Sequence, residues 1–160
     1  MDEQVLEREQ ILEVPLERAF DVFADAANLE ALTPPSLRFR IVTPQPIAMR
    51  VGTLISYRLR MRGIPISWLT RIAEWNPPHG FVDEQLRGPY ALWHHTHELE
   101  ARGDAATLIR DRVRYRVGFG PFGGLAHSLF VRRELERIFD FRLDAIHGLL
   151  PAEPGANSPS

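Results

Sequence analysis

The sequence predicts an α+β fold: a curved, seven-stranded antiparallel sheet wrapped around a long C-terminal helix, with two short helices after the first strand. Seven segments alternate apolar and polar residues, which is the pattern of strands with one buried face. Mostly short turns join consecutive strands, which favours antiparallel neighbours. The apolar-periodic segment 125–150 is the only one long enough to lie across the apolar face of such a sheet.

The first strand is expected over residues 5–14, with Leu6, Leu12 and Val14 on its buried face. Pro15 ends this strand and suits the first turn of a helix over residues 16–27. A second helical turn over residues 29–32 stops before two prolines, because a residue that precedes proline is pushed out of the helical region. The later strands are expected over residues 37–42, 53–62, 64–75, 81–87, 90–100 and 107–117.

Length and composition indicate one globular domain over residues 1–150 and a disordered C-terminal tail over 151–160. The net charge of −2 gives no overall field that would attract nucleic acid or an anionic membrane. The absence of cysteine excludes disulfides and thiolate chemistry, and the absence of lysine excludes Schiff bases. Without a signal-peptide pattern or an apolar run of about 20 residues, we expect a cytoplasmic protein with no transmembrane helix.

One strand carries the residues around which the function is expected to be built. Read with a period of two, Trp93, His95, His97 and Leu99 share one face. Aromatic and imidazole groups that face inward on a long hairpin indicate a lined cavity rather than a dry core. The turn at Gly88 and Pro89 joins this strand to the preceding one.

Several segments resemble a known superfamily. They are residues 14–20 (VPLERAF), 29–35 (LEALTPP), 77–85 (PPHGFVDEQ), 88–90 (GPY), 93–97 (WHHTH) and 111–115 (DRVRY). With them the chain resembles the START-like helix-grip superfamily, also called SRPBCC, and its polyketide cyclase/dehydrase-like subgroup, over residues 6–149. The resemblance implies a helix-grip fold with space between sheet and helix. Members include lipid carriers, hormone receptors and cyclases, so the fold does not settle the function.

The predicted function is binding of a small hydrophobic or amphipathic ligand in an internal cavity between the sheet and the C-terminal helix. Apolar walls with a few convergent polar groups are typical of such sites. The expected ligand-binding residues are Tyr57, Trp68, Asp83, Gln85, Trp93, His95, His97, Asp111 and Tyr115. The alternative is a polar cluster satisfied internally, in which the two aspartates fix the tautomers of the two histidines.

The sequence does not decide whether the protein is an enzyme. A cyclase, dehydrase or hydratase could use a cavity histidine–aspartate pair, for which the candidates are His95, His97, Asp83 and Asp111. Imidazole and carboxylate also suit zinc, iron or manganese, but no third histidine joins the pair and His94 points away. We therefore expect no metal and no other cofactor. Neither a Gly-x-Ser-x-Gly elbow nor a His-Glu-x-x-His motif occurs.

The connector 118–124 matches G-x-G-x-x-G, but no parallel strand follows its helix, so it does not predict a dinucleotide site. Phe119 and Phe122 in it are candidate lid side chains.

Two arginine stripes, at 58, 60 and 62 and at 110, 112, 114 and 116, are expected to face outward. If the first strand pairs with the last, as the resemblance implies, Glu7, Glu9 and Glu13 lie opposite the second stripe and give a solvated, charge-paired face. A protein-interaction surface there, and a homo-oligomer, remain open.

Overall fold

The computed structural model describes residues 2–118 and 125–150. Its elements are, in chain order, β1 (Gln4–Leu12), α1 (Leu16–Ala24), the 3₁₀ turns η1 (Ala26–Leu29) and η2 (Pro35–Leu37), β2 (Arg40–Ile41), β3 (Leu54–Met61), β4 (Ile64–Asn76), β5 (Gly80–Arg87), β6 (Tyr90–Arg102), β7 (Ala106–Val117) and α2 (Leu125–Leu149). The candidate lid residues Phe119 and Phe122 and the expected tail over 151–160 lie outside the described residues.

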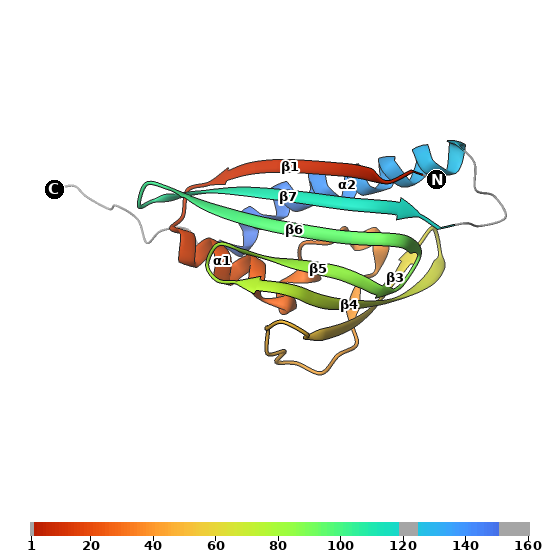
Figure 1. The fold of residues 1–160 in the computed structure, drawn as a ribbon, viewed down its shortest axis with the longest axis horizontal. Coiled ribbons are helices and arrows are strands. Elements are labelled where there is room, and N and C mark those ends of the chain that lie inside the picture. The colour runs from red at the N-terminus through yellow and green to blue at the C-terminus, as the bar shows by residue number, and fades with distance from the viewer. Residues whose placement is uncertain (1, 119–124, 151–160) are drawn as a thin grey trace.

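The seven strands form one antiparallel sheet in the order β1-β7-β6-β5-β4-β3-β2. From β2 to β7 each strand pairs with its neighbour in the chain, while β1 pairs with β7, the last strand. Figure 1 shows α2 running along the back of the sheet, behind β1, β7 and β6. The predicted fold, a curved antiparallel sheet around a long C-terminal helix with short helices after the first strand, is confirmed.

The inward face of β1 binds α2 through both apolar and polar side chains. Leu6 and Leu12 are buried on this face, as predicted. Between them, Arg8 Nε donates a hydrogen bond to Asp140 Oδ1 of α2 at 3.0 Å, and Gln10 Nε2 donates to the Leu143 carbonyl of α2 at 2.8 Å. The helix is therefore held against the edge strand by polar contacts at positions that point the same way as the apolar ones.

The helix α1 closes one end of the space between the sheet and α2. Its amphipathic face buries Ala19, Phe20 and Ala24, and the Phe20 ring packs edge-on against Trp75 at 5.3 Å and Phe81 at 6.3 Å between ring centroids. This end is packed as a hydrophobic core.

Two predicted details are wrong. Only Arg40–Ile41 of the strand expected over 37–42 pairs in the sheet, because Pro35 starts a 3₁₀ turn that Arg38 ends in the left-handed conformation. The second helical turn begins at Ala26 rather than at 29, because the Asp25 side chain accepts a hydrogen bond from the Ala27 amide and caps it there.

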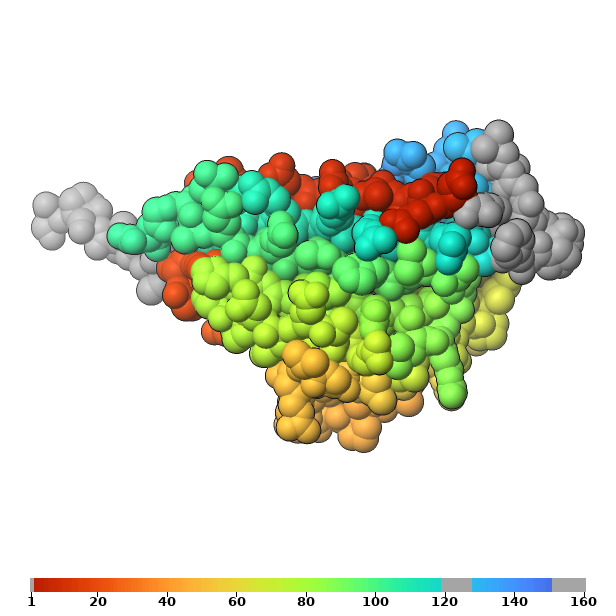
Figure 2. All heavy atoms as spheres, viewed as in Figure 1, coloured from red at the N-terminus to blue at the C-terminus, as the bar shows by residue number. Residues whose placement is uncertain are grey.

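The outward face of the sheet has the predicted charge pairing between β1 and β7. Arg110 Nε lies 3.1 Å from Glu9 Oε1, and Arg112 Nε lies 3.4 Å from Glu7 Oε1. In Figure 2 the strands cover this face, and α2 shows only along its upper margin. Arg62 departs from its stripe: it lies in the β3–β4 turn with its guanidinium 3.9 Å from the Phe130 ring centroid of α2.

Within the described part of the chain, no helix combines the length and the apolar character needed to cross a membrane.

Candidate functional site

A cavity of about 140 Å³ lies between α2 and strands β3 to β6. On the helix side its walls are Leu135, Ile138, Phe139 and Arg142, which share one face because they follow the i, i+3, i+4, i+7 spacing. Most of the remaining walls are apolar or aromatic. They include Phe23, Leu32, Leu37, Phe39, Met49, Ile55, Tyr57, Leu59, Met61, Trp68, Ile72, Phe81, Tyr90 and Trp93.

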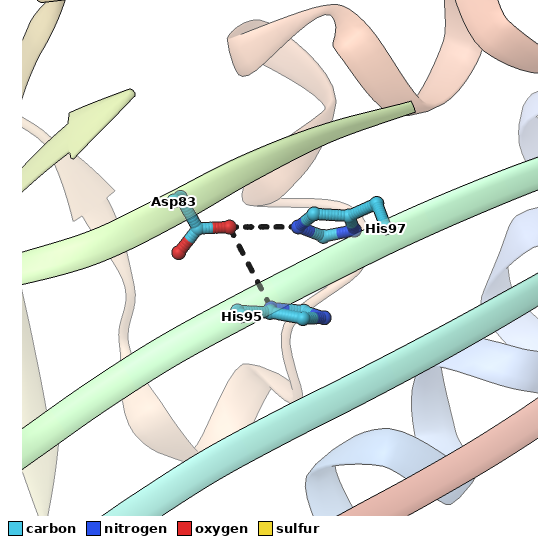
Figure 3. A group of neighbouring side chains, drawn as sticks. All are labelled: Asp83, His95 and His97. Carbon is cyan, nitrogen blue, oxygen red and sulfur yellow. Dashed lines mark hydrogen bonds and ion pairs between the residues drawn. The ribbon is translucent and has the colours of Figure 1, made fainter. Parts of the chain in front are cut away.

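Two histidines and two aspartates form a buried cluster at one wall of this cavity. Strand alternation turns His95 and His97 of β6 to the same side, and the register sets Asp83 of β5 opposite His95 and Asp111 of β7 opposite His97. Figure 3 shows the Asp83 carboxylate reaching from the neighbouring strand toward both imidazoles. Asp83, His95 and His97 line the cavity, whereas Asp111 lies behind the imidazoles.

Each imidazole lies between the two carboxylates. Because a carboxylate accepts only, His95 donates through Nε2 to Asp111 Oδ1 at 2.9 Å, and His97 donates through Nε2 to Asp83 Oδ2 at 2.7 Å. His95 Nδ1 is 3.6 Å from Asp83 Oδ2. His97 Nδ1 is 3.0 Å from Asp111 Oδ1 but makes no hydrogen bond with it, so among the described residues this buried nitrogen has an ionic neighbour and no hydrogen-bond partner.

Ring stacking fixes the orientation of the two imidazoles. The His95 and His97 ring centroids are 3.7 Å apart, and the Phe81 ring covers the other side of His97 at 4.1 Å. Gly80 permits this close approach of β5 to β6, since a Cβ at that position would lie 2.1 Å from the His97 carbonyl oxygen. The cluster is thus held by packing as well as by hydrogen bonds.

The environment moves the two imidazole pKa values in opposite directions. Burial, reinforced by the charge of His97, lowers the pKa of His95 below 6.5 although both aspartates oppose this. Burial also acts to lower the pKa of His97, but its contacts with Asp111 and Asp83 outweigh burial and raise that pKa above 6.5. For Asp83 and Asp111, burial is outweighed by the two histidines, which hold both carboxyl pKa values below 3.8.

Asp83, His95 and His97 offer ligand atoms within 4.8 Å of one another and are the described residues that could hold a metal ion. A tetrahedral ion with bonds of about 2.0–2.1 Å needs ligand atoms about 3.3 Å apart. Both nitrogens of each imidazole, however, already lie 2.7–3.6 Å from a carboxylate oxygen of Asp83 or Asp111. The arrangement therefore suits proton sharing between imidazoles and carboxylates.

The structure brings six of the nine expected ligand-binding residues to the cavity wall: Tyr57, Trp68, Asp83, Trp93, His95 and His97. The Tyr57 hydroxyl shares a hydrogen bond of 2.6 Å with Thr70 Oγ1. Burial, followed by the charge of Asp83, raises the pKa of Tyr57 above its usual value of 10.0, so this phenol stays neutral at ordinary pH.

Gln85 and Tyr115 are not among the residues that line the cavity. The Gln85 side chain donates to the Tyr90 carbonyl at 2.8 Å and accepts from the Tyr90 amide at 3.2 Å, so it braces the β5–β6 turn. Tyr115 faces inward but is covered by β1 and α2, and its hydroxyl donates to Gln4 Oε1 at 2.8 Å. Period-two alternation predicts a side chain's face correctly here, but not what covers that face.

Arg142 is a cavity residue that sequence reasoning missed. The signal was present, because Arg142 continues the apolar stripe of Leu135, Ile138 and Phe139 along α2. Its Nε is buried and, among the described residues, has no hydrogen-bond partner. The same holds for Nε1 of Trp68, another wall residue. Two buried donors without acceptors are therefore at the cavity.

No family model and no curated protein matches this sequence. Solved structures do resemble it in fold. An aromatase/cyclase from Streptomyces sp. R1128 is 15% identical with a TM-score of 0.73, covering 92% of this chain and 93% of that one. A START superfamily protein from Mycobacterium smegmatis is 11% identical, with a TM-score of 0.64 over 91% and 99% of the two chains.

Norcoclaurine synthase from Thalictrum flavum, in complex with dopamine and hydroxybenzaldehyde, is 14% identical with a TM-score of 0.63, covering 94% of this chain and 90% of that one. Identities this low carry the fold and not the activity. Together with the strand order and the position of α2, these structural matches show that this chain has the START-like helix-grip fold.

Proposed function

We propose that this protein binds a small hydrophobic or amphipathic molecule in the cavity between the sheet and α2. The observation that carries the proposal is the composition of the cavity walls: mostly apolar and aromatic side chains, with buried donors at Trp68 and Arg142 that lack acceptors among the described residues. Apolar walls supply affinity, and a few polar groups orient the ligand. A cavity of about 140 Å³ is comparable to an engineered cavity of about 150 Å³ that binds benzene.

A cavity-filling variant tests this proposal. Benzyl alcohol serves as a neutral, one-ring amphipathic probe, and its binding to the whole protein is followed by saturation-transfer NMR and calorimetry. We expect saturable binding that is lost in Ile138→Trp, whose larger side chain occupies the cavity, and retained in Leu129→Trp, since Leu129 is on the same helix but exposed. Binding that is absent, or unchanged in Ile138→Trp, would contradict the proposal. Native mass spectrometry of the protein from its own host then identifies the natural ligand.

A second candidate function is proton transfer to and from a bound carbonyl compound, as a cyclase or dehydrase requires. It is favoured by the opposite pKa shifts of two stacked imidazoles at the cavity wall. The directions of the two shifts suit His95, with the lowered pKa, to the role of base and His97, with the raised pKa, to the role of acid. The names of two structural neighbours, an aromatase/cyclase and norcoclaurine synthase, are compatible with such chemistry on this fold.

Exchange of the methyl protons of acetophenone in D₂O tests this second candidate. A base removes a proton from the carbon beside the carbonyl, and a deuteron returns from solvent. We expect the protein to accelerate exchange, and His95→Gln or His97→Gln to slow it by about 10²-fold or more while acetophenone still binds. His94→Gln is the matched control, because His94 is on the same strand and outside the cavity wall. Exchange that is equal in all variants leaves ligand binding as the function.

A further inference from the structure

The guanidinium of Arg142 has no oppositely charged partner among the described residues. Among the described residues no carboxylate forms an ion pair with it, and its buried Nε makes no hydrogen bond. Other arginines of the molecule are paired: Arg8 with Asp140 next to the same helix face, Arg71 with Glu84, and Arg110 with Glu9. Several exposed arginines also make no ion pair, but among the described arginines Arg142 is the one whose Nε is buried without a hydrogen-bond partner, and this needs a physical explanation.

The surroundings of Arg142 hold its charge at the cavity without satisfying its donors. The Phe139 ring, one turn earlier on α2, has its centroid 5.1 Å from Arg142 Cζ, a distance at which a ring face attracts a cation. A ring accepts no in-plane hydrogen bond from the guanidinium fork. Since a buried donor without an acceptor destabilises a fold, an acceptor supplied from the cavity would remove this cost.

An anion can lie near the two aspartates of the sheet wall because the imidazoles there offset their charge. Asp83 and Asp111 are each in contact with both imidazoles, so their charge is offset within the cluster. Asp83 is near enough to Arg142 for the guanidinium to help lower the pKa of that carboxyl, but the two make no ion pair. The cavity thus has a cation, Arg142, on its helix wall and an imidazole–carboxylate cluster, at His95 and His97, on its sheet wall.

We infer that the cavity ligand carries a carboxylate or a chemically similar oxyanion, which Arg142 binds, on an apolar body about the size of one aromatic ring. This inference rests on the proposed ligand binding and adds the chemical class of the ligand. The planar guanidinium presents donors in a fork that matches the two oxygens of a carboxylate. Aromatic walls at Trp68 and Trp93 would cover the ring.

Benzoate and benzamide form the test, because they have nearly the same shape and differ in charge. Both are titrated calorimetrically into the whole protein at pH 7.5 and about 0.15 M salt, where benzoate is ionised. We expect benzoate to bind at least tenfold more tightly than benzamide, since charge-assisted hydrogen bonds are about twice as strong as neutral ones. Arg142→Met should abolish this preference by weakening benzoate alone. Arg142→Lys, which keeps the charge but loses the fork, should give an intermediate preference.

Arg137→Met is the matched control, because Arg137 is on the same helix with its side chain 72% exposed, and it should keep the full preference. Equal or tighter binding of benzamide by the unaltered protein would overturn the inference and leave ligand binding intact. A preference for benzoate that survives in Arg142→Met would also overturn it, because another group would then bind the anion. If neither probe binds, both the inference and the proposed function for ring-sized ligands are wrong.

Discussion

The interface between the sheet and α2 has two halves, which differ in how far their inward-facing polar side chains are hydrogen-bonded. In the packed half, formed by β1 and β7, polar side chains find partners: Gln4 with Ser128, Arg8 with Asp140, and Tyr115 with Gln4. In the hollow half, formed by β3 to β6, Tyr57, His95 and His97 are hydrogen-bonded, but the wall donors Trp68 Nε1 and Arg142 Nε have no partner among the described residues. Buried polar groups in folded proteins are nearly always hydrogen-bonded. Under the proposed function, the unsatisfied donors of the hollow half are the groups that a ligand would satisfy.

The largest effect is expected where the two halves meet, at Asp111. Replacing it with alanine removes the acceptor of the His95 Nε2 hydrogen bond and one of the two carboxylates that contact both buried imidazoles, and losing one partner of a buried charged cluster costs roughly 3–5 kcal/mol. Urea unfolding at pH 7 measures this loss. Arg112→Ala, one residue away on the exposed face, should change the free energy of unfolding little, because exposed ion pairs contribute little. Similar losses for both variants would contradict the importance of the cluster.

Truncation along α2 compares the halves directly. Ile146 is fully buried in the hydrophobic core at the α1 end, so Ile146→Ala should cost about 2–5 kcal/mol. Ile138 faces the cavity and is partly exposed. Ile138→Ala should cost clearly less, because it enlarges a space that already exists instead of creating one. Chemical denaturation of both variants checks the order, and equal costs would mean that the cavity wall is packed as tightly as the core.

A smaller effect separates a satisfied polar group from an unsatisfied one. Tyr115→Phe removes the hydrogen bond to Gln4 and should lower the free energy of unfolding by about 1 kcal/mol. Arg142→Met removes a partly buried cation that has no ion pair among the described residues, so it should leave the stability unchanged or raise it. A substantial loss in Arg142→Met would show that Arg142 serves the fold. Thermal and urea unfolding of the two variants provide the comparison.

The smallest effect is expected in the pH dependence. NMR titration of the imidazole protons should give a midpoint below 6.5 for His95 and above 6.5 for His97. Because the pKa of His97 is raised by folding, its stabilising contribution is fully present below pH 6.5 and is lost as pH rises through the folded value. The lowered pKa of His95 acts oppositely: stability falls as pH drops below 6.5 and the unfolded chain takes up the proton. Midpoints in the reverse order would contradict the arrangement.

The acidic residues of the cluster act in a different pH range. The folded pKa values of Asp83 and Asp111 are below 3.8, so their contribution is present above that pH and is lost as the pH falls through the folded values. Acid unfolding of Asp111→Asn compared with the unaltered protein measures this contribution. The variant should lose less stability between pH 5 and pH 3.

The sequence by itself determined the succession of strands along the chain, the position of the long helix at its C-terminal end and the inward face of most strands. These follow from alternation, turn residues and the length of one helical segment, all of which are local. Local signals also turned His95 and His97 to one side of β6. They failed at Leu37, where Pro35 imposes a 3₁₀ turn on a segment with strand-like alternation.

Tertiary structure decided which inward residues meet a cavity and which meet a neighbour. Tyr115 and Trp68 both face inward, but β1 and α2 cover Tyr115 while Trp68 borders open space. The pairing of each imidazole with a particular aspartate depends on the register between strands, and the place of Arg142 depends on how α2 lies across the sheet. Such contacts join residues far apart in the chain, and period-two or 3.6-residue patterns carry no information about them.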